Sequence, residues 1–471
     1  MIDLQTFLAC LPGIKPLVSR MIRKGTGDCL TDQGRNSEDL LSLAKIRTIA
    51  EWVSFLRCRR RVYSSGQIRR IRAIMIKAIH PFPARMAPEL ALAGLDGLSE
   101  GSVVLDPMTG SGTVCRQASD LGHRGFAFDM DPLAVLMTRA WTTPYDDAVL
   151  ARVADEVVGD FGRIDGDAVE LEWIDKDPET DAFARFWFGD AQRNELRKLA
   201  FLIDRRASAA VSADEIAAVD ILRVAMSRIV ITKENGASLA RDVSHSRPHK
   251  VTDQTDYDVL KGFEKSIRFL RGRLADAPPK GQVTVRRGDA RNMSILADGS
   301  IDAVLTSPPY LNAIDYLRGH RLALIWLGHR ISELRKIRSD SIGSERRPDL
   351  ANDSEDMARI TLSMGDTSPL PARFRNMIDR YVQDLHKLMS ELDRVMKPNC
   401  QATFVVGNSC LRGVFIDNAA AVAKAAECVG FTIAAKTERE LPEASRYLPL
   451  TSDKLGKRMR SEVILTLRSA A

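Results

Sequence analysis

Residues 103–113 read VVLDPMTGSGT, a short apolar strand that breaks into a turn with two glycines. The segment 114–121 that follows can form a helix. A strand, a glycine turn and a helix in this order bring a nucleotide-like ligand against backbone N–H groups at a helix N-terminus. Only Gly110 and Gly112 are present, so the fuller G-x-G-x-x-G pattern of dinucleotide enzymes is missing, which disfavours an oxidoreductase.

The next predicted strand, residues 125–128, ends in the acidic stretch DMDP at 129–132. A carboxylate at the end of a second strand can accept hydrogens from two ribose hydroxyls. Asp131 fits the N-cap of a helix over 133–140, because Pro132 then stands at the first helical position. In the simpler interpretation, Asp129 and Asp131 both serve only as caps.

A second motif, TSPPY at residues 306–310, follows the strand-like run 301–305. It predicts a rigid, exposed corner, because each proline fixes φ and has no N–H. Such a corner can present carbonyl oxygens to an amino group and a ring face to a planar base. The simpler interpretation is a strand that leaves the sheet through a Pro-Pro turn, with Tyr310 packed on the surface.

Both motifs resemble those of the S-adenosylmethionine-dependent DNA amino-methyltransferases, which methylate the exocyclic amine of cytosine or adenine. Residues 106–113 are similar to the DPFxGSGT signature of that family, with Met108 where Phe is usual. Residues 307–310 are similar to the loop in which Asp, Asn or Ser precedes Pro-Pro-Tyr or Pro-Pro-Phe.

Two further segments resemble the same family in the right order along the chain. HPFPARMAPEL at 80–90 is similar to the segment that covers the methionine end of the cofactor. RRGDAR at 286–291 is similar to the third-strand end whose acid reads the adenine amino group. The resemblance spans residues 78–140 and 281–470.

The resemblance implies an α/β, Rossmann-like methyltransferase fold, with a doubly wound, mostly parallel seven-stranded sheet and a helical insertion. It implies S-adenosyl-L-methionine as cofactor and a base flipped out of double-stranded DNA as substrate. The catalytic residues carried over are Ser307, Pro308, Pro309 and Tyr310. The cofactor-binding residues carried over are Phe82, Asp106, Pro107, Gly110, Gly112, Thr113, Asp129, Asp289 and Thr306.

The identity of the base and the nucleic acid stay open at this stage. Serine at position 307 is, by resemblance, commoner in cytosine-N4 enzymes than in adenine-N6 enzymes, which favours N4 of cytosine as the target. An adenine-N6 DNA enzyme and an RNA base amino-methyltransferase are the alternatives. A silent DNA-binding subunit of a defence complex is the non-enzymatic alternative. Expected partners are DNA and a cognate restriction endonuclease or defence-system subunits.

The composition is that of an ordinary soluble globular protein of 471 residues, with 45% hydrophobic and 28% charged residues and a net charge of +6. No apolar run is long enough to span a membrane. The seven cysteines never form a C-x-x-C pair, so neither a zinc site nor a disulfide framework is indicated. We therefore expect a cytoplasmic protein of a prokaryote or phage, without a structural metal.

The pattern along the chain predicts four parts. They are a basic N-terminal extension (1–75), a cofactor-binding half (76–140), a mainly helical insertion (141–280) and a catalytic half (281–471) with a loop insertion (311–375). Residues 57–72 hold seven arginines, and residues 233–250 form a polar, cationic loop; both are candidates for DNA contact. We expect residues 186–188 to anchor the insertion and residues 337–374 to form a long mobile loop. Either 141–280 or 311–375 reads the target sequence, and 311–375 is slightly favoured because it follows the catalytic loop directly.

Overall fold

The computed structural model describes residues 76–82, 85–232, 235–241, 248–311, 315–344, 355–440 and 461–470. The chain divides into two units, Met1–Ile68 and Arg69–Ala471, and every described residue belongs to the second. The predicted basic extension, including the arginine-rich stretch 57–72, lies outside the described residues.

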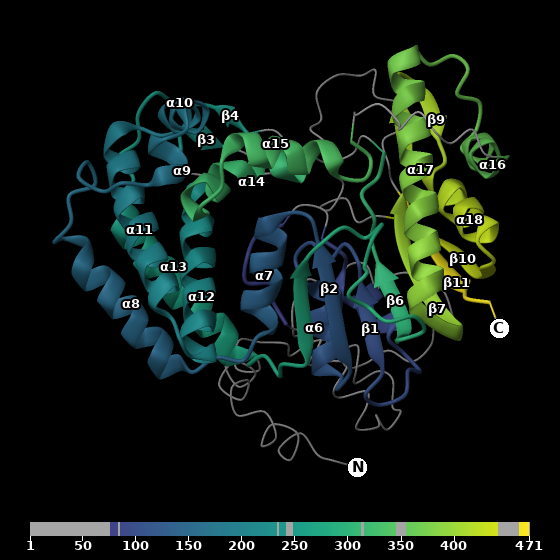
Figure 1. Cartoon of the computed structure of the whole chain (residues 1–471), viewed down its shortest axis with the longest axis horizontal. Helices are drawn as coiled ribbons and strands as arrows, with labels where there is room; N and C mark the ends of the chain where they lie inside the picture. Colours follow the sequence, from purple (N-terminus) through teal and green to yellow (C-terminus); the bar gives the residue numbers. More distant parts are fainter. Residues whose placement is uncertain are drawn as a thin grey trace, which may run out of the picture. The chain divides into compact units, whose positions relative to one another are not determined.

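A seven-stranded sheet forms the centre of the second unit, with the strand order β10-β11-β7-β6-β1-β2-β5 (Figure 1). Neighbouring strands are parallel, except that β11 is antiparallel to both β7 and β10. The strands are β1 Val103–Asp106, β2 Arg124–Asp129, β5 Val283–Arg287, β6 Ile301–Thr306, β7 Met396–Gly407, β10 Thr432–Glu440 and β11 Ser461–Arg468. The predicted mostly parallel, seven-stranded sheet is confirmed.

Helices cover both faces of this sheet because side chains alternate along each buried strand. Val104 packs with the helices on one face, whereas Val103 and Leu105 pack with those on the other. The first face carries α5 Pro88–Gly94, α6 Thr113–Asp120 and α7 Pro132–Thr142, and the second carries α17 Ala372–Val395 and α18 Asn418–Cys428. The fold is therefore doubly wound, as predicted.

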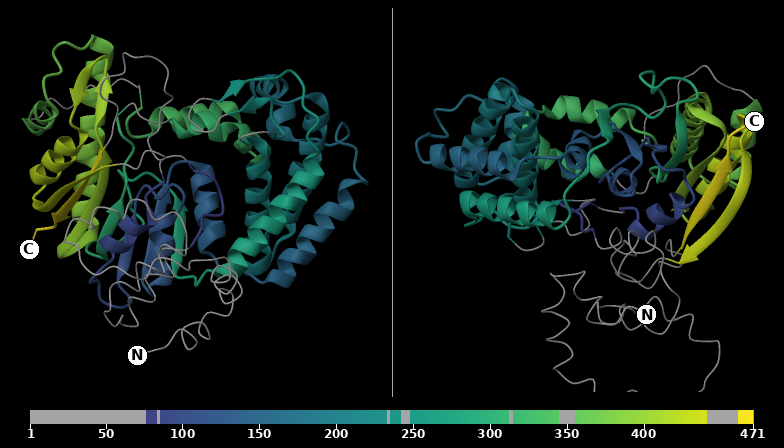
Figure 2. Two further views of the ribbon diagram at one scale, coloured as in Figure 1. Left: turned by 180° about the vertical axis from the view of Figure 1, so that it is seen from behind. Right: turned by 90° about the horizontal axis from the view of Figure 1, so that it is seen from below.

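The last two strands of the chain form the antiparallel end of the sheet. β10 pairs with β11 over its whole length, with a register irregularity between Ile433 and Ala435. Their curvature is visible in the yellow strands of Figure 2. Such twist is normal where right-handed strands pair at a sheet edge.

The chain between α7 and β5 is mainly helical. α12 packs against both α7 and α8, so the apolar core of this block is continuous with that of α7. The elements are α8 Asp147–Phe161, α9 Glu172–Asp175, α10 Pro178–Trp187, α11 Asp190–Ala209, α12 Ala213–Val230, α13 Val259–Asp276 and the two-residue strands β3 Ala240–Arg241 and β4 His249–Lys250.

One aromatic contact connects this helical block to the chain that follows β6. Phe188 meets Trp326 edge to face, with ring centroids 5.0 Å apart, and both rings are buried. Trp326 lies in the 3-10 helix η2 Ile325–Leu327. Phe186, by contrast, is 55% exposed, so the prediction that residues 186–188 act together as an anchor is wrong for Phe186.

The segment after β6 is more ordered than predicted. It contains α14 Tyr316–Leu324, α15 Ile331–Asp340 and α16 Glu355–Ser363. The prediction of a long mobile loop over 337–374 is therefore wrong for the end of α15 and for α16. Few apolar residues mark these helices, but Ile337 and Ile360 are buried, and burial of such a sparse face is sufficient to hold a surface helix.

A short hairpin follows β7 at the edge where the parallel strands end. It consists of β8 Ser409–Leu411 and β9 Val414–Ile416. Its turn residues, Arg412 and Gly413, have φ angles of 50° and 87°. None of the helices in the described ranges is long and apolar enough to cross a membrane.

Candidate active site

Three strand ends bring the predicted cofactor residues to one edge of the sheet. β2, β1 and β6 are adjacent and parallel, so Asp129, Asp106 and Thr306, their last residues, lie at the same edge. This carboxyl edge is where open α/β sheets bind ligands. The catalytic loop begins directly after Thr306, and the glycine turn directly after Asp106.

Asp106 joins the glycine turn to β6. Its side chain is buried, and its Oδ1 atom accepts a hydrogen bond from Thr306 Oγ1 at 2.8 Å and a longer one from the Met108 N–H at 3.3 Å. Burial, opposed by these two hydrogen bonds, raises the pKa of the Asp106 carboxyl from 3.8 to about 7. Pro107, also buried, starts the turn.

Only glycine fits at two positions of this turn. Gly110 has a φ of 51° and Gly112 a φ of 84°, both in the left-handed region. A Cβ at Gly110 would stand 3.0 Å from ring atoms of Phe82, and one at Gly112 would stand 2.9 Å from Thr138 Oγ1. The turn leads directly into α6, which begins at Thr113.

The carboxylate of Asp129 is fixed in place by two backbone N–H groups. Asp129 Oδ2 accepts from the Gly110 N–H and Oδ1 accepts from the Asp131 N–H, both at 2.9 Å. Burial, with a smaller effect from the neighbouring Asp131 carboxylate, raises the pKa of Asp129 to about 6. Asp131 itself accepts from the Leu133 N–H, which confirms its predicted role as the N-cap of α7.

These groups fit the polar parts of the predicted cofactor. Each oxygen of Asp129 accepts from one of these backbone donors and keeps a lone pair for a ribose hydroxyl. Thr109 Oγ1 is buried at the turn, and within the described part of the chain it has no hydrogen-bond partner. The buried Asp106 carboxyl is suited to pair with a cationic amino group.

Two residues of this site were missed by the sequence analysis, Tyr316 and His320 of α14. Tyr316 stacks on Phe82 with ring centroids 5.0 Å apart and an interplanar angle of 15°. His320 is buried, and its Nδ1 lies 2.5 Å from Asp131 Oδ2. The only signal in the sequence is the i, i+4 spacing of two rings on a helix that follows the catalytic loop.

In the predicted catalytic loop, the hydroxyl hydrogen of Ser307 is already used in a hydrogen bond. Ser307 Oγ donates to the Val405 carbonyl of β7 at 3.0 Å and also hydrogen-bonds the side chain of Tyr310. Because its hydrogen is used by Val405, the oxygen can act only as an acceptor toward a further group. Pro308 is buried and Pro309 is partly exposed, and neither has an N–H. Ser307 thus offers an acceptor directly after the strand next to the glycine turn.

The loop is less exposed than predicted. Tyr310 is only partly exposed and packs against the core that contains the fully buried Tyr381 of α17. Burial, and next the Glu462 carboxylate, raise the pKa of the Tyr310 phenol to about 12. The expectation of a fully exposed corner is corrected because α17 and β7 cover one side of it.

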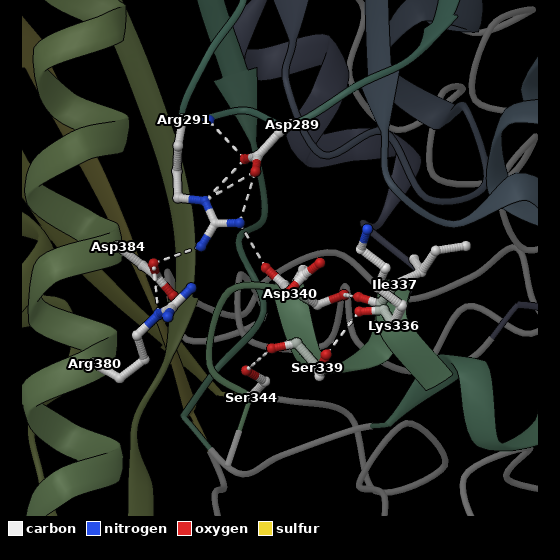
Figure 3. A network of polar contacts seen from close by, with 10 residues as sticks. Asp289, Arg291, Lys336, Ile337, Ser339, Asp340, Ser344, Arg380 and Asp384 are labelled. Atoms are coloured by element: carbon white, nitrogen blue, oxygen red, sulfur yellow. Dashed lines mark hydrogen bonds and ion pairs between the residues drawn. The ribbon is translucent and has the colours of Figure 1, made fainter. Parts of the chain in front are cut away.

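Asp289, the predicted adenine-reading acid, is held by a network centred on Arg291 (Figure 3). The guanidinium of Arg291 donates to both oxygens of Asp289, at 2.9 Å from Nε to Oδ1 and 2.6 Å from a terminal nitrogen to Oδ2. It also donates to Asp384 of α17 and to the Asp340 carbonyl at the end of α15, both at 2.5 Å. Asp384 accepts in addition from Arg380.

This network balances two guanidinium groups against two carboxylates, of which Asp289 is 32% exposed and Asp384 is buried. The side chains of Arg291 and Asp384 are 9% and 1% exposed. Burial opposes the charge on Arg291, but Asp289 and Asp384 outweigh it and raise the pKa of the guanidinium. Arg291 therefore connects the end of β5 to both α15 and α17.

In the described part of the cationic loop at 233–250, the charged side chains contact residues close to them in the sequence. Arg241 donates to the Ser238 and Ala240 carbonyls, and Lys250 pairs with Asp253 at 2.8 Å. Residues 233–234 and 242–247 lie outside the described ranges. DNA contact by this loop stays a prediction, as it does for residues 57–72.

Comparison with known proteins identifies distant relatives, although no protein-family model matches the chain. The chain is 24% identical over 359 residues to Type II methyltransferase M.MvaI of Kocuria varians, which covers 72% of this chain and 78% of that protein. It is 23% identical over 400 residues to Type II methyltransferase M.BsoBI of Geobacillus stearothermophilus, with coverage of 71% and 74%. These matches confirm the resemblance found in the motifs.

The similarity to solved structures is too low to support a functional conclusion. TTHA0409 of Thermus thermophilus, a candidate DNA modification methylase in complex with S-adenosyl-L-methionine, is 15% identical. The aligned region covers 39% of this chain and 54% of the TTHA0409 chain, with a TM-score of 0.21.

Proposed function

Because this chain is a distant relative of the type II DNA methyltransferases, we propose that it methylates the exocyclic amino group of a base in DNA. S-adenosyl-L-methionine is the methyl donor. The observation that carries the proposal is the hydroxyl of Ser307, which donates its hydrogen to Val405 and so presents only lone pairs. That oxygen follows β6, which is paired directly with the strand that leads into the glycine turn.

The catalytic loop must activate a poor nucleophile, because the lone pair of an exocyclic amine is delocalised into the ring. Ser307 Oγ and the Pro308 carbonyl accept the two amino hydrogens and favour a pyramidal nitrogen as the N–C bond forms. After the methyl group is transferred, the cationic nitrogen loses one of these protons to solvent. S-adenosyl-L-methionine supplies an electrophilic methyl group and a good leaving group. Most of the acceleration comes from positioning and from these fixed acceptors.

The target base has to leave the duplex stack before its amine can reach Ser307. Flipping costs a few kcal/mol, and stacking on an aromatic ring returns roughly 1–3 kcal/mol. Tyr310 supplies this ring, and its contact with the α17 core keeps the ring in a fixed position. A preordered ring loses less conformational entropy when the base arrives.

The cofactor is held by the residues around the glycine turn. Asp129 would accept from the ribose hydroxyls, and Asp106 would pair with the amino group of the methionine part. Arg291 makes two contacts to each oxygen of Asp289, so Asp289 would accept from the adenine amine by exchanging one of these contacts. Phe82 covers the methionine part. The backbone positions that shape this site are Pro107, Gly110, Gly112, Thr113 and Thr306.

We assign N4 of cytosine as the target atom, since serine precedes the two prolines. The activity belongs in a restriction-modification system, in which the partner is an endonuclease that cuts the same unmethylated site. We place target recognition in the 311–375 segment, because α14 and α15 follow the catalytic loop directly.

The test is nucleoside mass spectrometry on DNA and RNA from a methylation-free host that expresses this chain. Ser307→Ala should abolish the modification. Ser300→Ala is a matched control, since Ser300 Oγ also donates to a backbone carbonyl, that of Ala297, but at the opposite end of β6. N4-methylcytosine that is lost only in Ser307→Ala supports the proposal.

The other outcomes each exclude part of the proposal. N6-methyladenine in DNA would keep the reaction and change the base. Modified RNA with unmodified DNA would refute the assignment of DNA as the substrate. No modification in either, from a protein that still binds the cofactor, would favour a silent DNA-binding subunit.

A further inference from the structure

Two aromatic rings from distant parts of the chain lie together over the glycine turn. Phe82 precedes α5, and Tyr316 is the first residue of α14. The rings stack at 5.0 Å, and Phe82 closes on Gly110 so tightly that a Cβ there would be 3.0 Å from the ring. Neither ring is fully buried, so each keeps some accessible surface besides the face that it turns toward the other ring.

His320 links the aromatic pair to the acid proposed to hold the ribose. Its ring centroid is 5.7 Å from that of Phe82, and its Nδ1 contacts Asp131 at 2.5 Å. Asp131 donates its backbone N–H to Asp129, which also accepts from the Gly110 N–H. The contacts therefore form a closed circuit, from Phe82 through His320, Asp131, Asp129 and Gly110 back to Phe82.

We propose that Phe82 and Tyr316 form a cation-binding aromatic pair that recognises the sulfonium charge of the methyl donor, with His320 as a positioning residue. This rests on the proposed function. Aromatic faces attract onium cations, more strongly where water is excluded. The partly buried pair stands over the same turn as Asp129 and Asp106, whose carboxyls also favour a cation.

The aromatic pair also affects how donor and product compete for the site. Methyl transfer moves the methyl carbon from sulfur to nitrogen, and the sulfur of S-adenosylhomocysteine keeps the bonding electron pair and is neutral. The aromatic pair then loses its electrostatic attraction while every hydrogen bond to the ribose and adenine persists. The pair would therefore favour the donor over the product, which a purely space-filling contact would not do.

The test compares the dissociation constants of S-adenosylmethionine and S-adenosylhomocysteine by calorimetry. Tyr316→Leu should weaken the donor roughly 3- to 30-fold more than the product, the range expected for a cation–π contact. Tyr316→Phe, which keeps the ring face, should restore the wild-type ratio. Phe186→Leu, at an exposed phenylalanine of α10, is the matched control and should leave both constants unchanged.

Equal weakening of both ligands in Tyr316→Leu, or no change in either, would overturn the proposal and leave a structural contact. If Tyr316→Leu does not fold, Phe82→Leu and Tyr316→Met provide the same comparison. A wild-type protein that binds neither ligand would refute the proposed function itself, so the two failures are distinguishable. His320→Asn is expected to weaken both ligands alike, because its effect passes through Asp131 to the ribose.

Discussion

Replacing Asp106 with Asn should stabilise the cofactor-free protein at alkaline pH, although Asp106 lies in the proposed cofactor site. The side chain is 3% exposed, and burial raises the pKa of its carboxyl from 3.8 to about 7. In the unfolded chain the carboxyl ionises near its ordinary pKa. Between these two values the folded state binds more protons than the unfolded state, so stability falls as pH rises.

The size of the effect follows from the two pKa values. Above pH 8 the ionised Asp106 costs the folded protein about 4 kcal/mol relative to a neutral side chain, and at pH 5 the cost is about 2 kcal/mol. Asn is neutral at every pH and can still accept the Thr306 hydrogen bond through its Oδ1. The variant should therefore gain roughly 2–3 kcal/mol over the wild type between pH 5 and pH 8.

The assay is equilibrium unfolding in guanidinium chloride at both pH values, without cofactor. Asp147→Asn is the control, because Arg271 lowers the pKa of that exposed carboxyl and its effect should be the same at pH 5 and pH 8. Equal stability differences for Asp106→Asn at the two pH values would refute the reasoning. The same variant should bind S-adenosylmethionine at least 10-fold more weakly by calorimetry, since the cationic amino group loses its anionic partner.

Three further outcomes are expected. Cofactor affinity of the wild type should rise with pH through about 6 and about 7, the pKa values of Asp129 and Asp106, and Asp129→Asn should remove the lower step in a calorimetric pH series; a series that keeps the lower step would exclude Asp129. Arg291→Ala should destabilise the fold by about 3–5 kcal/mol in denaturant unfolding, because it leaves Asp384 buried beside a single guanidinium, and a loss under about 1 kcal/mol would contradict a structural role. Gly112→Ala should lower the melting temperature in calorimetry, by strain of about 1–2 kcal/mol plus a clash with Thr138, and an unaltered temperature would show that the turn can relax.

The sequence predicts those parts of the molecule that depend on near neighbours. The apolar runs before Asp106 and Ser307 predict strands, and the structure has β1 and β6 at these places. The proline after Asp131 predicts a helix that begins there, and Asp131 is the N-cap of α7. The mostly parallel, seven-stranded sheet follows from the family resemblance.

The contacts made between distant segments were not predictable in the same way. Tyr316 meets Phe82, and Arg291 meets Asp384, only because α14 and α17 return to the sheet, and no local pattern records such a return. α16 was missed for another reason. Its residue Ile360 is fully buried, but polar and charged neighbours dominate the composition of the segment.

The strand order also affects how the protein is made. β1 lies between β2, which follows it closely in the chain, and β6, whose last residue Thr306 is 200 residues from its hydrogen-bond partner Asp106. A chain emerging from the ribosome therefore exposes the glycine turn long before β6, the strand that precedes Ser307, exists. Such non-local pairing slows folding, and unpaired apolar strands favour aggregation until it is complete. Synthesis that stops before β6 yields a chain with a glycine turn but without Ser307, so under the proposed mechanism a prematurely ended product would lack the acceptor for the amine.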